Sequence, residues 1–124
     1  MNVALWVVQA LLAAAFALSG LIKVTQSKAS LGARMAWTQD ASPSLIKVIG
    51  LLEVAAALGL MLPGVLHVTP VLTPLAATGL ALIMVGAMVT HARRGERGEV
   101  ALNIGLLALA VVVLWGRFGP YPLT

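Results

Sequence analysis

Four long apolar runs follow one another along the chain, separated by shorter polar segments. They cover residues 3–22, 45–62, 71–90 and 100–116, and few side chains within them are strongly polar. A bilayer core about 30 Å thick needs about 20 helical residues, with an accepted range of about 17–25. Each run meets that length, and a helix satisfies its own backbone hydrogen bonds inside lipid. The pattern predicts an all-α integral membrane protein with four spans.

The connections between the runs are mostly short, which predicts an antiparallel four-helix bundle and a single domain over residues 1–124. The segment Ser42-Pro43-Ser44 is expected to cap the start of the second helix. Pro63 and Gly64 are expected to end that helix, because proline cannot continue the backbone hydrogen-bond pattern.

The first connection, residues 23–44, is long for a protein of this size. Its stretch 27–37 mixes apolar with basic residues and ends in Trp37, a residue type that favours the membrane interface. Two interpretations stay open: a short helix lying in the headgroup region with Trp37 as its anchor, or an unstructured cytoplasmic loop.

Composition agrees with a membrane protein and excludes several other classes. Hydrophobic residues make up 60% of the chain and charged residues 10%, against about a quarter charged in soluble domains. A soluble enzyme and a nucleic-acid binder are excluded, although the formal net charge is +4. The absence of cysteine excludes disulfides, thiol catalysis and cysteine-ligated metals. The partner that the composition predicts is the lipid bilayer.

Basic residues alternate between the connections and predict the orientation. The first and third connections carry them, the second carries none, and the C-terminal tail carries Arg117 alone. The basic residues of the first and third connections are Lys23, Lys28, Arg34, Arg93, Arg94 and Arg97. Because cytoplasmic loops are enriched in lysine and arginine, both termini are expected outside.

Small residues recur at helical spacing, which matters because lipid gives no hydrophobic reward for helix association. Gly50 and Ala57 share one face of the second run, and Gly79 and Gly86 share one face of the third. On the fourth run one side carries Ala101, Gly105, Ala108, Val112 and Gly116. We expect these stripes to pack helices within the bundle, and a homodimer face is the alternative use.

Glu53 is the polar side chain that most needs an explanation, because it lies about 12 Å into the second helix. An acidic group at that depth is expensive unless it is protonated, paired or directed into the bundle. Side chains at a matching depth come from the cytoplasmic ends of the other helices, whereas Gln9 lies too close to the outer surface. The predicted cluster consists of Ser19, Lys23, Glu53, His91 and Asn103. Such a cluster could hold the polar headgroup of a ligand or pass a proton.

A structural role explains the same residues without a ligand. Glu53 could hydrogen-bond a neighbouring helix, while Lys23 and His91 mark the cytoplasmic interface. The charged segment 93–99 is expected to form a solvated turn beside the lipid headgroups. His67 and His91 are predicted on opposite sides of the bilayer, about 30 Å apart, so they cannot share a metal ion or haem. No metal site and no covalently bound cofactor are expected.

Four stretches are distinctive in their order and spacing. They are residues 15–23 (AFALSGLIK), 49–60 (IGLLEVAAALGL), 73–77 (TPLAA) and 91–96 (HARRGE), the last followed by Asn103. In this order they resemble the DoxX-like family of small bacterial membrane proteins. The resemblance covers nearly the whole chain and implies a four-helix protein of the bacterial cytoplasmic (inner) membrane. The family's polar positions fall on the same five residues that depth selects.

The family takes its name from a subunit of an archaeal quinol oxidase or thiosulfate:quinone oxidoreductase, and other relatives are linked to oxidative-stress complexes. The resemblance therefore implies an accessory subunit of a quinone-linked redox or assembly complex, with a membrane protein partner and a quinone as ligand. Two alternatives stay open. One is a proton-coupled small-molecule exporter that uses Glu53. The other is a membrane enzyme for a lipophilic substrate, with Glu53 as acid or base and Lys23 or His91 as the orienting group.

Overall fold

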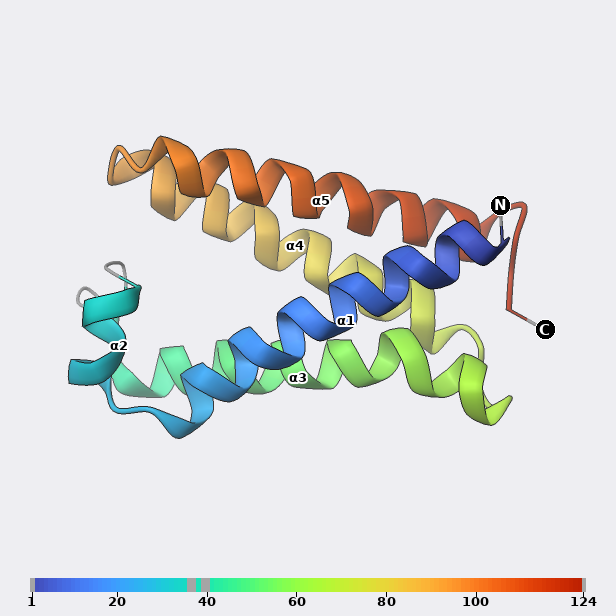
Figure 1. Ribbon diagram of the computed structural model, residues 1–124, viewed down its shortest axis with the longest axis horizontal. Coiled ribbons are helices and arrows are strands. Elements are labelled where there is room, and N and C mark those ends of the chain that lie inside the picture. Colours follow the sequence, from blue (N-terminus) through green and yellow to red (C-terminus); the bar gives the residue numbers. More distant parts are fainter. Residues whose placement is uncertain (1, 36–37, 39–40, 124) are drawn as a thin grey trace.

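The computed structural model describes residues 2–35, 38 and 41–123, and that part of the chain folds into helices (Figure 1). The α-helices are α1 (Asn2–Thr25), α2 (Lys28–Arg34), α3 (Pro43–Leu66), α4 (Leu72–Arg93) and α5 (Arg97–Phe118). Both ends of the chain lie at one end of the molecule and α2 lies at the other (Figure 1).

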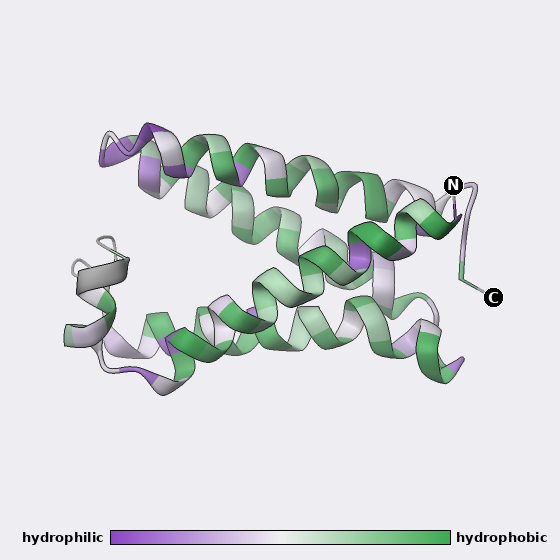
Figure 2. Cartoon of the chain, viewed as in Figure 1, coloured by the Kyte–Doolittle hydropathy of each residue, from purple (hydrophilic) through white to green (hydrophobic). Residues whose placement is uncertain are grey.

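Four of these helices, α1, α3, α4 and α5, are long and apolar enough to cross a membrane. Each has 22 or 24 residues, which corresponds to a length of about 33–36 Å. Apolar residues cover most of them, and hydrophilic residues gather at the α4–α5 turn (Figure 2). The predicted four-helix membrane bundle is confirmed.

Helix α3 begins as predicted but ends later. The hydroxyl oxygen of Ser42 accepts a hydrogen bond from the Leu45 N–H at 3.1 Å, which confirms the predicted cap. The helix then continues through Pro63 and ends at Leu66, so the expectation that Pro63 ends it is wrong. The physical reason is that Pro63 has no N–H to donate to the Gly59 carbonyl oxygen, and the Thr73 hydroxyl donates to that oxygen instead.

Of the two interpretations of residues 27–37, the structure contains the short helix. The hydroxyl oxygen of Ser27 accepts a hydrogen bond from the Ser30 N–H at 3.2 Å and caps α2. Leu31 anchors this helix, because it is 1% exposed and clusters with Ile46 of α3. Trp37, the predicted interfacial anchor, lies outside the described residues, and the position of α2 at a membrane surface stays a prediction.

The four long helices pack as two pairs. The most extensive packing joins α1 to α3 and α4 to α5, and further contacts of α3 with α4 and α1 with α5 hold the pairs together. The main buried core lies between the pairs and consists of Leu12, Phe16, Ala57, Leu60, Ala77, Leu80, Met84, Ala110 and Val113. At the α2 end the polar residues described below replace this apolar packing.

The predicted stripes of small residues pack the helices only in part. A Cβ atom on Gly79, Gly86 or Gly105 would meet nothing within 4 Å in the part of the chain that the structure describes. Other members of the stripes do pack closely. A Cβ on Gly20 of α1 would lie 2.5 Å from the carbonyl oxygen of Gly50 of α3, and a Cβ on Gly116 of α5 would lie similarly close to a side chain of α1. A homodimer face stays a prediction.

Candidate functional site

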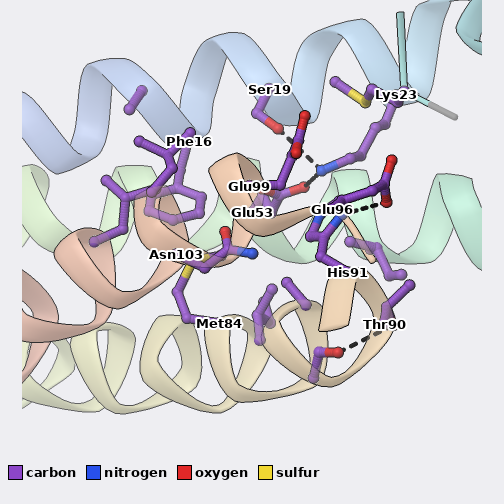
Figure 3. A pocket seen from close by; sticks show the side chains of 18 residues that line it. Phe16, Ser19, Lys23, Glu53, Met84, Thr90, His91, Glu96, Glu99 and Asn103 are labelled. Atoms are coloured by element: carbon purple, nitrogen blue, oxygen red, sulfur yellow. Dashed lines mark hydrogen bonds and ion pairs between the residues drawn. The ribbon is translucent and has the colours of Figure 1, made fainter. Parts of the chain in front are cut away.

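A cavity of about 710 Å³ lies between the two helix pairs at the α2 end of the bundle. All five residues of the predicted polar cluster line it: Ser19, Lys23, Glu53, His91 and Asn103. They come from α1, α3, α4 and α5, and their side chains are directed toward one another (Figure 3). The cluster therefore exists as a group in space, and its use as a ligand site stays a prediction.

The most buried charges of the cavity form an ion pair between Lys23 of α1 and Glu53 of α3. Glu53 is 1% exposed and Lys23 8% exposed. The Lys23 ammonium donates to a Glu53 carboxylate oxygen and, at 2.9 Å, to the Ser19 hydroxyl one turn earlier on its own helix (Figure 3). A buried carboxylate needs such a partner because burial removes the water that would otherwise solvate its charge. Glu53 is thus directed inward and paired.

The close approach of α1 and α3 explains why these two side chains meet. Gly20 and Gly50 bring the two backbones together beside Lys23, and a Cβ atom on Gly50 would lie 2.8 Å from the Gly20 carbonyl oxygen. Lys23 and Glu53 each lie three residues further along their helices, about one turn away from that contact. The two glycines therefore position the ion pair.

A second charged group lies across the cavity, at the α4–α5 turn. His91 Nδ1 lies 2.9 Å from a Glu96 carboxylate oxygen, to which Arg94 Nε donates at 3.1 Å. The hydrogen bond with His91 lowers the pKa of the Glu96 carboxyl below its ordinary value, and the charge of Arg94 lowers it further. The turn is exposed, as predicted, because Arg93, Arg94, Arg97 and Glu99 are exposed and Glu96 is half-buried. Glu96 and Glu99 also line the cavity, which the sequence did not indicate. His91 contacts Glu96 of this turn, in addition to lying at the end of α4.

Asn103 of α5 offers the cavity a hydrogen-bonding group that the protein itself does not use. Its side chain is 7% exposed, and its Nδ2 has no hydrogen-bond partner among the described residues. Buried polar groups nearly always have partners, so an unpartnered amide in a cavity wall indicates a place where a ligand oxygen or a water can bind.

The cavity changes character with depth. Phe16 lies about one turn deeper than Ser19 on α1, and Leu106 about one turn deeper than Asn103 on α5. Charged and amide groups therefore surround the α2 end, while the deeper wall is apolar. Such a cavity suits a molecule with a polar head and an apolar body.

The sequence interpretation missed a second polar group, at the opposite end of the bundle. Gln9 is fully buried and donates from Nε2 to the Leu60 carbonyl oxygen at 2.6 Å. Its own amide oxygen accepts from Arg117 Nε at 2.7 Å. The sequence did contain an indication of this contact. Because the first and fourth long helices are antiparallel, Gln9 near the start of the first and Arg117 at the end of the fourth lie at the same end of the bundle.

Within the described residues, no group of three histidine, cysteine, aspartate or glutamate side chains could hold a metal ion. Comparison with known proteins found neither a curated protein nor a solved structure that matches the chain. The sequence model of the DoxX-like family matches residues 7–113, a segment that includes all five predicted cavity residues. The chain therefore belongs to the DoxX-like family, as its sequence motifs predicted.

Proposed function

We propose that this protein binds a quinone-class amphiphile in the cavity around Glu53 and acts as an accessory subunit of a quinone-linked complex in the bacterial cytoplasmic membrane. The observation that carries the proposal is the cavity of about 710 Å³ with an ion pair and an unpartnered amide in its wall. Its volume lies in the range of small-molecule sites, about 300–1,000 Å³.

The chemistry of the wall matches a quinone headgroup. A quinone presents two carbonyl oxygens, which accept hydrogen bonds, on an apolar ring that carries an apolar tail. The Asn103 amide can donate to one of these oxygens, and the deeper wall, with Phe16 and Leu106, accommodates apolar surface. The tail then extends toward the lipid that surrounds the bundle.

Reduction of a quinone to a quinol takes up two electrons and two protons. The Lys23–Glu53 pair and His91 line the cavity and contain the groups that can hold such protons. The electrons have to come from a redox group on a partner protein, since this chain brings no cysteine and its two histidines lie at opposite ends of the bundle. For this reason we propose an accessory subunit rather than a complete oxidoreductase.

The same ion pair weighs against a proton-coupled exporter. In that mechanism a membrane carboxylate exchanges a proton for a cationic substrate, so it has to be accessible to both. Here the Lys23 ammonium already occupies the Glu53 carboxylate, and the carboxylate is 1% exposed. A cationic substrate would have to displace the Lys23 ammonium, which the chain itself holds beside Glu53.

Binding of decylubiquinone, a quinone with a short alkyl tail, tests the proposal. The purified protein in mild detergent is expected to bind it saturably, and Asn103→Leu is expected to weaken binding by about five- to tenfold because one hydrogen bond is lost. Asn103→Leu removes an unpartnered amide, so the variant is expected to fold. Lys23→Met should weaken binding as well.

Lys47→Met is the matched control, because Lys47 is an exposed lysine that donates to the Val24 carbonyl oxygen and does not line the cavity. It should leave decylubiquinone binding unchanged. Absence of saturable binding by the wild type, or equal binding by Asn103→Leu, would refute the quinone site. A native preparation that contains neither quinone nor a partner subunit after repeated extraction would refute the accessory role.

A further inference from the structure

Arg117, near the end of α5, is a buried cation far from the cavity described above. Its side chain is 3% exposed. Nε donates to Gln9, and Nη1 donates to the Asn2 side-chain oxygen and, at 2.9 Å, to the Tyr121 carbonyl oxygen. The guanidinium carbon also lies 5.5 Å from the centre of the Trp6 ring. Every one of these contacts is with a neutral group.

Two things that a buried guanidinium normally has are missing. Nη2, which carries two of the five N–H groups, has no hydrogen-bond partner in the described part of the chain. No carboxylate among the described residues pairs with Arg117 either, because Glu53, Glu96 and Glu99 line the cavity at the opposite end of the bundle. A buried charge without an opposite charge is strongly unfavourable, so this guanidinium favours the binding of an anion beside it.

A second cavity, of about 390 Å³, lies beside the residues that hold this cation, and Arg117 lies behind them rather than in the cavity wall. Three residues that contact Arg117 also line it, namely Asn2, Trp6 and Tyr121, and His67 lines it from the end of α3. The first turn of α1 begins at Asn2, and its backbone N–H groups and helix dipole favour a negative charge at the same place. Asn2 therefore links the three features, because it begins α1, contacts Arg117 and lines the cavity.

We propose that this cavity binds a phosphate oxyanion, and specifically the phosphate of an anionic phospholipid headgroup, with Arg117 as its counter-charge. Guanidinium groups recognise phosphate through paired N–H donors. Asn2 is exposed, so its amide oxygen can give up its place on Nη1 to a phosphate oxygen. A lipid is the favoured source because Trp6 and Tyr121 are of the types that concentrate where lipid headgroups lie. This site is independent of the quinone proposal.

Native mass spectrometry of the protein in mixed micelles of detergent with dioleoylphosphatidylglycerol or dioleoylphosphatidylcholine tests this assignment. The wild type is expected to retain phosphatidylglycerol selectively, and Arg117→Gln is expected to weaken its retention by about tenfold. Arg97→Gln removes an equal charge from the exposed turn at the other end and should change retention by less than about twofold. Equal retention of both lipids by the wild type, or equal losses in both variants, overturns the proposal.

Asn2→Ala keeps the experiment decisive if Arg117→Gln does not fold. This variant removes the neutral acceptor that competes with the lipid while Arg117 stays in place, so phosphatidylglycerol should bind several-fold more tightly. Weaker binding by Asn2→Ala overturns the proposal. Inorganic phosphate in excess identifies the source of the anion. If it binds to the lipid-free wild type and displaces phosphatidylglycerol completely, the site is one for free phosphate and the lipid assignment is wrong.

Discussion

The Thr73 hydroxyl donates a hydrogen bond to the Gly59 carbonyl oxygen at 2.8 Å and so joins the start of α4 to α3. In a regular helix this oxygen accepts from the residue four positions further on, which here is Pro63 and has no N–H. Thr73 is fully buried, so water does not replace the missing donor there. A side chain of the next helix therefore allows α3 to continue through a proline.

Thr73→Val is expected to lower the free energy of unfolding by about 1–3 kcal/mol, because it leaves a buried carbonyl oxygen without a donor. Thr78→Val is the matched control. Thr78 donates to the Pro74 carbonyl oxygen at 2.8 Å within its own helix, and that oxygen also has its regular backbone donor. Unfolding in sodium dodecyl sulfate, followed by tryptophan fluorescence, measures both. Equal effects of the two variants would show that the bond across the helices has no special role.

Gly20→Ala is expected to separate α1 from α3. The added Cβ atom would lie 2.5 Å from the Gly50 carbonyl oxygen and 2.7 Å from a Val54 methyl carbon, and a backbone oxygen cannot move aside alone. We expect a loss of about 1–3 kcal/mol in unfolding free energy, typical of overpacking. Gly79→Ala, where nothing described lies within 4 Å, should instead gain up to about 1 kcal/mol from helix propensity. A stable Gly20→Ala would show that the backbone contact is loose.

The four spans and the inward direction of Glu53 could be predicted from sequence because lipid allows few alternatives. Span length is fixed by the bilayer, and a carboxylate among apolar residues must be directed into the bundle or be neutralised. The depth of each polar residue along its helix then selected five side chains, and all five line one cavity.

What the sequence could not provide depends on contacts between helices. The choice of Lys23 as partner of Glu53 follows from the close approach of α1 and α3 at two glycines, which no single-helix pattern specifies. Gln9 and Arg117 are 108 positions apart, and each alone looks like an ordinary residue near a span end. Pro63 looks like a helix end unless the donor on α4 is known.

The Lys23–Glu53 pair is expected to show strong coupling in a double-mutant cycle. Lys23→Met or Glu53→Gln alone should lower the unfolding free energy by about 3–5 kcal/mol, because each leaves a buried polar group without its partner. The double variant should lose less than the sum, with a coupling of about 0.5–3 kcal/mol. Lys47→Met, an exposed change of the same kind, should stay within about 0.5 kcal/mol of the wild type. Additive effects would mean that the ion pair does not form in the bilayer.

Acid is expected to loosen the α4–α5 turn through Glu96. The hydrogen bond with His91 and the charge of Arg94 lower the pKa of this carboxyl from its ordinary value of 4.5. A lowered pKa in the folded state contributes stability above pH 4.5, and that stability is lost as the pH falls through the lowered value. The stability difference between wild type and Glu96→Gln should therefore shrink below pH 4.5.

Unfolding curves measured from about pH 3 to about pH 7 provide the comparison, because this range includes the ordinary pKa of a glutamate carboxyl. His91→Gln should reduce the same pH dependence, because it removes the larger cause of the shift. If Glu96→Gln loses stability in acid as steeply as the wild type, the His91–Glu96 hydrogen bond does not contribute to the turn.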